Sequence, residues 1–250
     1  MPPDHPLPPG GPLRLSGPVV VAARHGDRQL WRLALPHGVD PRAVVEGALG
    51  PAARLALPDV RREPGGELLL TYAVAGECDP PDVDALLGVG PLQRAPGLVV
   101  APGEAAQAVQ RVAASVLVWA RGALLATQYS GVTGAPGAWA LPGGGVDAGE
   151  EPRVAARREC WEESGQHVEV GPLLRVTSRH WLGRSPAGRL EDFHGLSLVY
   201  AGRCPAPTVP VVHDVDGSTA DAAWVPAASV PGLGWAPAQR WLAHEDPPAG

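Results

Sequence analysis

The sequence contains no lysine, no isoleucine and no asparagine, and it has a single phenylalanine and a single methionine. The three missing residue types have AT-rich codons, so their absence indicates a GC-rich genome rather than a function. All 20 basic residues are therefore arginine, against 26 Asp and Glu, which gives a net charge of −6 over 250 residues. Because the chain is acidic and has no basic run, it lacks the electrostatic surface of a nucleic-acid-binding protein, and we expect no nucleic-acid partner.

Cysteine and long apolar runs are also scarce. Cys78, Cys160 and Cys204 are widely spaced and form no CxxC pair, which argues against a disulfide framework and a cysteine-based zinc site. No apolar run approaches the roughly 18 residues of a membrane helix, and the Pro-rich start lacks the apolar core of a secretory signal. We therefore expect a cytoplasmic protein with no membrane partner.

Glycine and proline, with 32 and 30 residues, divide the chain into two parts. Residues 1–17 and 244–250 are Pro-rich and non-periodic, and we expect both to be tails. Residues 18–95 are expected to form a small N-terminal α/β domain of unknown role, residues 96–108 a linker, and residues 109–243 a second domain.

Local sequence patterns predict the elements of both parts. In the first part the pattern predicts strands at 18–24, 30–36, 53–60 and 67–76 and a helix at 40–50. In the second part it predicts a hairpin at 116–128, strands at 173–181, 195–202 and 222–227, and a closing helix at 238–245.

The most informative segment of the chain is a glycine-rich loop followed by a helix. Gly143–Gly145 cannot form regular helix, and three successive glycines allow the backbone to approach a metal or a phosphate closely. Pro152 is favourable in the first turn of a helix, and no helix breaker follows before Gly165. We therefore predict a helix over 151–164.

Three carboxylates share one face of this helix. Glu159, Glu162 and Glu163 lie at spacings of i, i+3 and i+4, which places their side chains within an arc of about 100°. Neighbouring like charges repel one another, and a hard divalent cation such as Mg²⁺ compensates them. A solvated acidic helix face is the competing interpretation.

The spacing between loop and helix resembles the signature of the Nudix hydrolases, GX5EX7REUXEEXGU, in which U is a bulky aliphatic residue. Gly144, Glu150 and the run from Arg158 to Gly165 fill all seven fixed positions. We call Gly144–Gln166 the box. The upstream run Trp139–Gly143 is also similar to the family.

The chain departs from the signature at two of the U positions. Cys160 is a small apolar substitute that packs acceptably, whereas Gln166 is polar and is expected to loosen the packing behind the helix. Neither position carries charge or binds metal in the family pattern. The resemblance covers roughly residues 110–243, strongly at the box and loosely elsewhere.

The resemblance implies both a fold and a function. The fold is of the α/β class (α+β type): a Nudix α/β/α sandwich with a mixed sheet, preceded by the small N-terminal α/β domain. The function is a pyrophosphohydrolase, dependent on Mg²⁺ or Mn²⁺, that cleaves the diphosphate linkage of a nucleoside diphosphate derivative. The substrate is a small-molecule nucleotide of the nucleoside triphosphate, nucleotide sugar or ADP-ribose type, and family habit implies a homodimer.

The resemblance also implies roles for single residues. The metal ligands are Glu159, Glu163, Glu162 and the backbone carbonyl of Gly144, and Glu162 is alternatively the general base. Arg158 and Glu150 orient the carboxylates. In many relatives the base is a carboxylate beyond the box, for which Asp221 is the first candidate and Glu191 and Asp192 are the second. The catalytic set is therefore Glu162, Glu159, Arg158 and Asp221.

Substrate contacts are expected near the 183–192 loop. Arg179, Arg189 and Trp181 are the candidates, because Arg binds phosphate with two hydrogen bonds and Trp stacks on a nucleobase. His180, His194 and Arg184 flank or lie in the same loop. A solvated hairpin and ordinary core packing of tryptophan are the competing interpretations.

Two other function classes are compatible with the fold. A nucleotide-sensing protein would use the Nudix fold for binding and the N-terminal half for output, although it would not need intact carboxylates. Isopentenyl-diphosphate isomerase chemistry would need a cysteine upstream of the box, where Cys78 lies in a Pro- and Asp-rich stretch, and this interpretation is disfavoured.

Overall fold

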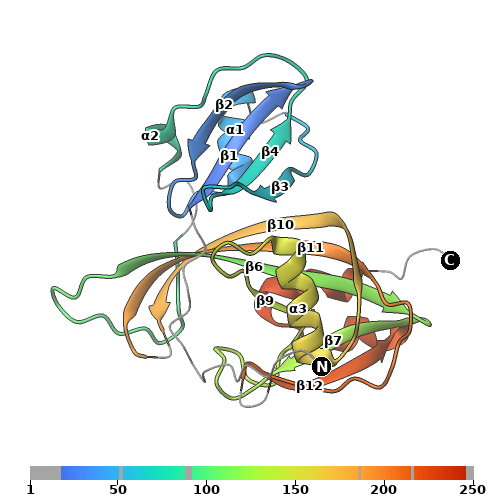
Figure 1. The fold of residues 1–250 in the computed structure, drawn as a ribbon. Helices are drawn as coiled ribbons and strands as arrows, with labels where there is room; N and C mark the ends of the chain where they lie inside the picture. The colour runs from blue at the N-terminus through green and yellow to red at the C-terminus, as the bar shows by residue number, and fades with distance from the viewer. Residues whose placement is uncertain (1–17, 51–52, 88–91, 186, 215–216, 246–250) are drawn as a thin grey trace.

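The computed structural model describes residues 18–50, 53–87, 92–185, 187–214 and 217–245, and these form two β-sheets. Figure 1 shows the smaller sheet, formed by the N-terminal half, lying against the side of the larger sheet that carries β10 and β11. The predicted tail at 1–17 lies outside the described residues, as do residues 246–250 of the predicted tail at 244–250. His244 is the last residue of a 3₁₀ helix.

The smaller sheet has the strand order β2-β1-β4-β3, with β1 and β4 parallel and the outer pairs antiparallel. Its elements are β1 (Val19–His25), β2 (Arg28–Ala34), α1 (Pro41–Leu49), β3 (Asp59–Arg62), β4 (Leu68–Ala73) and the short helix α2 (Val83–Leu86). The Asp40 side chain caps α1 by accepting a hydrogen bond from the Arg42 N–H. The strand predicted at 53–60 begins only at Asp59, because Pro58 has no N–H to donate to a neighbouring strand.

The larger sheet is mixed and follows the order β12-β7-β6-β11-β10-β5. β6 and β11 are parallel, whereas β10 pairs antiparallel with β11 and β12 pairs antiparallel with β7. The elements of this half are β5 (Gln93–Arg94), β6 (Gln107–Ala120), β7 (Ala123–Tyr129), β8 (Trp139–Ala140), β9 (Gly143–Gly145), α3 (Pro152–Ser164), β10 (Glu169–Arg184), β11 (Leu190–Arg203), β12 (Thr219–Pro226) and the 3₁₀ helices η1 (Ala227–Gly232) and η2 (Pro237–His244).

Alternate side chains along the strands reach opposite faces of this sheet. Val116 and Val118 of β6 pack with Cys160 of α3, whereas Leu117 between them packs against the cluster that contains Leu242 of η2. The sheet therefore lies between α3 and the 3₁₀ helices, and the predicted layered mixed sheet is confirmed. The closing helix differs from the prediction: it is a 3₁₀ helix with a non-helical residue at Gln239. The Gln239 side chain accepts a hydrogen bond from the Leu141 N–H.

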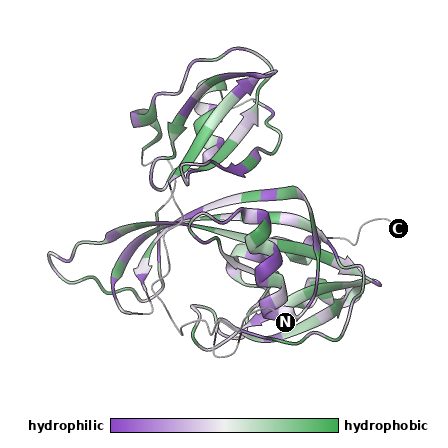
Figure 2. Cartoon of the chain, viewed as in Figure 1, coloured by the Kyte–Doolittle hydropathy of each residue, from purple (hydrophilic) through white to green (hydrophobic). Residues whose placement is uncertain are grey.

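The two sheets share one hydrophobic core. A continuous cluster of buried side chains includes Val21 and Leu70 of the small sheet together with Val112 and Leu196 of the large one. Figure 2 shows the apolar positions along the strands of both sheets and a hydrophilic band on α3. None of the described helices has the length and hydrophobicity needed to cross a lipid bilayer.

Candidate functional site

The box helix α3 holds Glu163 in the interior of the protein. The helix runs from Pro152 to Ser164 and ends at Gly165 in the left-handed conformation, close to the predicted bounds. Only 2% of Glu163 is exposed. Its Oε2 accepts a hydrogen bond from the Gly143 N–H at 2.9 Å, and its Oε1 accepts one from the Thr219 hydroxyl at 2.6 Å. Both carboxylate oxygens are thus fixed by groups from β9 and β12.

Arg158 ties the other box carboxylates together. Its Nε and Nη2 donate to the two oxygens of Glu150 at 3.0 and 2.9 Å, and its Nη1 donates to Glu159 at 2.7 Å and to Glu162 at 3.0 Å. Nη2 also donates to the Gly145 carbonyl at 3.1 Å, so the guanidinium binds the loop as well. The hydrogen bonds that Arg158 donates to Glu150, together with the charge of Glu159, raise the pKa of Arg158, which therefore stays ionised.

Burial shifts the acidity of two box glutamates. It raises the pKa of Glu159 to about 7, and the charges of Glu162 and Asp214 act in the same direction against that of Arg158. It also raises the pKa of Glu163 to about 7, against the hydrogen bonds from Thr219 and Gly143. Both groups hold a proton more readily than exposed glutamates, because burial removes the water that would stabilise the ionised carboxylate.

Glycine at position 144 is required by the close approach of Glu159. A Cβ atom built on Gly144 would lie 2.6 Å from Cδ and Oε2 of Glu159. Gly143 has φ +156° and a Cβ there would lie 2.5 Å from the Ala114 carbonyl, whereas a Cβ on Gly145 would meet nothing within 4 Å. The three glycines of β9 therefore differ. Gly143 allows close packing against β6, Gly144 leaves room for the Glu159 carboxylate, and Gly145 meets no steric requirement.

A carboxylate that sequence reasoning missed, Asp214, lies close enough to act on the charged cluster. Its charge contributes to the raised pKa of both Glu159 and Glu163. The backbone brings it there because the N–H groups of residues 213 and 214 both donate to the Glu162 carbonyl, at 2.7 and 3.0 Å. The signal in the sequence was weak, since Asp214 lies in an irregular loop outside any motif.

Asp221, the predicted base, lies on β12 next to a register shift. Its side chain is exposed and accepts a hydrogen bond from the Ala222 N–H at 2.8 Å. In the described part of the chain, no hydrogen bond or ion pair joins Asp221 to the box glutamates. Thr219, two residues earlier on the same strand, does contact Glu163.

The donor set suits a hard divalent cation. Glu159, Glu162, Glu163 and Asp214 supply carboxylate oxygens, which Mg²⁺ prefers, and one guanidinium cannot balance them all. Among the described residues, the box glutamates do not form a triad whose ligand atoms all lie within 4.8 Å of one another. Mg²⁺ usually binds only one or two protein carboxylates, together with waters and substrate phosphates, so it does not require three converging glutamates.

Two of the three predicted substrate residues line a pocket of about 480 Å³. Arg179 and Trp181 of β10 form one wall, and Tyr129 of β7 and Pro237 of η2 also line it. Burial raises the pKa of Tyr129, and the charges of Glu163 and Arg179 act on it in opposite directions. Tyr129 therefore lies within electrostatic reach of both the box and the pocket.

The remaining loop residues lie elsewhere. Arg189 is exposed and does not line this pocket. Arg184 borders the pocket and binds Glu104 through two hydrogen bonds, of 2.8 and 2.9 Å, which fasten the 99–104 segment to β10. Glu191 pairs with Arg111 at 3.8 Å, and Asp192 contacts His180 and His37 at the junction of the two sheets.

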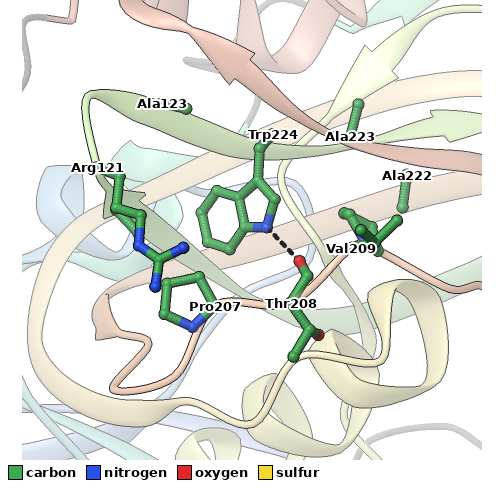
Figure 3. A pocket seen from close by; sticks show the side chains of 10 residues that line it. Arg121, Ala123, Pro207, Thr208, Val209, Ala222, Ala223 and Trp224 are labelled. Atoms are coloured by element: carbon green, nitrogen blue, oxygen red, sulfur yellow. Dashed lines mark hydrogen bonds between the residues drawn. The ribbon is translucent and has the colours of Figure 1, made fainter.

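A larger pocket, of about 670 Å³, lies at the β7–β12 edge of the sheet. Figure 3 shows Trp224 at its centre, with the indole N–H donating to the Thr208 carbonyl at 2.9 Å. Apart from Arg121, its lining is alanine, proline, valine, threonine and this tryptophan. A surface of this composition is poorly suited to a pyrophosphate.

The polar residue Gln166 does not loosen the packing behind α3. It is 1% exposed, and its amide nitrogen donates to the Ser164 carbonyl at 3.1 Å and to the Thr208 hydroxyl at 3.0 Å. Its amide oxygen accepts from the Thr208 N–H at 3.0 Å. Gln166 thus fixes the loop before β12, a role that the family pattern does not indicate.

Comparison with known proteins gives one family match and several partial likenesses. The model of the NUDIX domain matches residues 98–244. The chain is 49% identical over 45 residues to the RNA pyrophosphohydrolase of Roseobacter denitrificans (18% of this chain, 28% of that protein). It is 45% identical over 47 residues to Nudix hydrolase 26, chloroplastic, of Arabidopsis thaliana (19% of this chain, 20% of that protein).

These alignments span about a quarter of each curated relative. Among solved structures, the fold is similar to the MutT NUDIX hydrolase from Burkholderia pseudomallei, with 26% identity and a TM-score of 0.43. That likeness covers 54% of this chain and 96% of the other.

Proposed function

Because the chain belongs to the Nudix hydrolase family, we propose that it is a divalent-metal-dependent pyrophosphohydrolase that cleaves the diphosphate linkage of a nucleoside diphosphate derivative. One observation carries this proposal: the buried Glu163 carboxylate is held by Gly143 and Thr219 beside Glu159, in the register of the box. Burying a carboxylate costs stability unless it is hydrogen-bonded and its charge is paired or bound to a metal, and a bound cation would supply the missing compensation. A sensing protein would have no need for this arrangement.

Glu159 and Glu163 are the principal residues that would hold Mg²⁺ or Mn²⁺, with Glu162 and the Gly144 carbonyl as further ligands. When bound, the cation neutralises the charge of the pyrophosphate, orients its oxygens and lowers the pKa of a bound water. Arg158 keeps Glu159 and Glu162 in place and offsets part of their repulsion. Glu150 in turn fixes the guanidinium, and the Asp147 N–H donates to Glu150 at 3.1 Å.

Glu162, Asp214 and Asp221 are the candidates for the general base that takes a proton from the attacking water. A base must lie within hydrogen-bond reach of that water, directly or through one more water. Asp214 acts electrostatically on Glu159 and Glu163, and Glu162 is bound to Arg158 at 3.0 Å. Both Asp214 and Asp221 accept a local backbone N–H, from Ser218 at 3.0 Å and from Ala222 at 2.8 Å. We favour Asp214, because its charge acts on two box glutamates.

The pocket between β7, β10 and η2 is the proposed nucleoside site. Trp181 offers a ring for stacking on the base, and Arg179 offers a cation for a phosphate. Arg179 lies over the Trp181 ring, with its guanidinium carbon 5.4 Å from the ring centroid. This contact positions both groups at the same wall of the pocket.

The substrate is proposed to be a small nucleotide of the nucleoside triphosphate, nucleotide sugar or ADP-ribose type. The similarity to an RNA pyrophosphohydrolase raises RNA as a competing substrate class. The net charge of −6 and the absence of a basic run disfavour a long polyanion.

The test is phosphate or pyrophosphate release from a panel of these nucleotides, dinucleoside polyphosphates and a 5′-triphosphate RNA, with and without Mg²⁺. Wild type is compared with Glu163→Gln, and Glu169→Gln serves as the control because Glu169 forms an exposed pair with Arg203. Mg²⁺-dependent turnover of one class, lost in Glu163→Gln alone, supports the proposal. Nucleotide binding without turnover of any substrate would instead favour the sensing function. Asp214→Asn and Asp221→Asn, assayed on the accepted substrate, then identify the base.

A further inference from the structure

A second group of metal-ligating side chains lies where the two halves of the chain meet. His37 follows β2, His180 lies on β10 and Asp192 lies on β11. The Nε2 atoms of His37 and His180 lie 3.1 and 2.5 Å from the same oxygen, Oδ1 of Asp192. Among the described residues, this is the one set of three potential ligands whose ligand atoms all lie within 4.8 Å of one another.

The fold itself brings the three side chains together. In the antiparallel β10–β11 ladder His180 pairs with His194, and Asp192 lies two residues along β11 on the same face. The N-terminal half approaches this face through Gly38, which has φ +77°. A Cβ on Gly38 would lie 2.5 Å from Nδ1 of His180. Glycine therefore allows the backbone to close over the His180 ring and brings the adjacent His37 to Asp192.

We propose that His37, His180 and Asp192 bind a divalent transition-metal ion of the Zn²⁺ type that joins the N-terminal half to the β10–β11 hairpin. Two imidazoles and one carboxylate are a donor set that Zn²⁺ accepts, whereas Mg²⁺ prefers oxygen alone. The three side chains are 29%, 19% and 30% exposed. Solvent therefore reaches the group, and water completes a four-coordinate shell.

The dimensions of the group require only a small adjustment. Ligand atoms about 2.0–2.2 Å from a tetrahedral zinc lie about 3.3 Å from one another. The His37–Asp192 separation of 3.1 Å is already close to this value, and the His180–Asp192 separation of 2.5 Å must open by less than about 1 Å. The ligand atoms of the two histidines lie within 4.8 Å of each other, and we expect side-chain rotations to supply the remaining adjustment.

The third histidine of the neighbourhood, His194, supports the group without being a ligand. Its ring centroid lies 5.6 Å from that of His37 and 6.3 Å from that of His180. Both of its ring nitrogens are engaged, with the Gln110 side-chain amide and the Ser178 hydroxyl, each at 2.9 Å. His194 is fully buried and fixes the floor on which the two ligand histidines pack.

The site is tested by titrating the untagged, EDTA-stripped full chain with Co²⁺, followed by visible absorption, and by displacing the Co²⁺ with Zn²⁺. The double variant Glu159→Gln/Glu163→Gln removes the two principal carboxylates of the box from the titration. In this background we expect one equivalent of Co²⁺ to give the intense visible bands of a tetrahedral site, without a thiolate charge-transfer band. Zn²⁺ in hundredfold excess over its Kd should raise the Tm by about 5–10 °C.

Three single variants, made in the same background, locate the site. His37→Gln and Asp192→Asn should lose the Co²⁺ bands. The amide introduced by Asp192→Asn still accepts hydrogen bonds from both imidazoles, so this variant removes the metal ligand and keeps the hydrogen bonds. His25→Gln, which changes an exposed histidine of the same half, should bind like the double variant. If the double variant shows no tetrahedral bands, or if His37→Gln and Asp192→Asn retain them, the group is only a hydrogen-bonded bridge and the proposal is wrong. The first of these outcomes does not depend on how well the single variants fold.

Discussion

Replacing Gly144 by alanine should separate the chemistry of the box from the stability of the fold. The added Cβ would lie 2.6 Å from the Glu159 carboxylate, whereas ordinary van der Waals contact begins at 3.4 Å. The carboxylate must therefore move by about 0.8 Å. Gly144 does not have a positive φ, and the group that it meets is the end of a flexible side chain, so the backbone accommodates alanine without strain.

The expected cost falls on catalysis. Metal sites tolerate deviations of only about 0.2 Å in ligand distance, and a misplacement of about 1 Å at an active site can cost a hundredfold in rate. We expect kcat/KM to fall by about a hundredfold, which corresponds to about 2.7 kcal/mol of transition-state stabilisation. The Tm should change by less than about 3 °C. Steady-state kinetics at saturating Mg²⁺ and a thermal melt measure the two quantities.

The neighbouring glycines are the matched controls. Gly145→Ala places its Cβ in open space and should behave as wild type. Gly143→Ala combines φ +156° with a 2.5 Å approach to the Ala114 carbonyl, and should lower the Tm more than either. The reasoning is refuted if Gly144→Ala keeps full activity. It is also refuted if Gly145→Ala loses as much activity as Gly144→Ala, because the effect would then come from loop flexibility rather than from Glu159.

Three further predictions concern the carboxylates and the contact between the halves. Glu163→Gln should lower turnover by about a hundredfold or more. Its Tm in EDTA should equal or exceed that of wild type, because the amide accepts a hydrogen bond from Gly143, donates one to Thr219 and carries no buried charge. A lower Tm would show that the ionised carboxylate stabilises the fold. In EDTA, wild type should lose stability as the pH rises from about 5 to 8. Glu159 and Glu163 have pKa values of about 7 in the folded protein against an ordinary value of 4.5, so the native state binds more protons than the unfolded state in this window. The rise in Tm caused by Mg²⁺ should therefore be larger at pH 8 than at pH 6, and an equal rise at both would contradict the assignment. Arg62→Ala removes two hydrogen bonds, at 3.1 and 3.0 Å, from the N-terminal half to the Glu150 carbonyl of the box, and should lower the Tm by about 3–6 °C. The control Arg61→Ala, which changes an exposed neighbour, should leave the Tm unchanged. Equal Tm values for the two variants would show that this contact does not stabilise the fold.

The box helix and its carboxylates were predictable because their signals are local. Pro152 and Gly165 predict the two ends of the helix to within two residues. The i, i+3, i+4 spacing of the glutamates places them on one face in any regular helix. The layered mixed sheet followed from the family resemblance, since strand order depends on contacts between residues far apart in the chain. The same resemblance gave Arg158 its place among the carboxylates.

Residues that act through long-range contacts were not predictable. Asp214 and Thr219 reach the box because the loop before β12 folds back along α3, and no local pattern marks that path. His37 lies 155 residues from Asp192 in the sequence. From the sequence alone it looks like an isolated histidine in a turn, because its contact with Asp192 depends on how the two sheets pack. Gln166 looks like a packing defect in the sequence because its partner, Thr208, lies 42 residues away.

The single hydrophobic core that runs through both halves limits how this chain can be altered or recombined. The segment that matches the family begins at residue 98, but the apolar side chains that complete its interior include Val21 and Leu70. We expect a gene fragment cut at that point to leave part of this apolar interior exposed to water and to be less stable than the full chain. We therefore expect the two halves to unfold together in one transition, and two separate thermal transitions would contradict this.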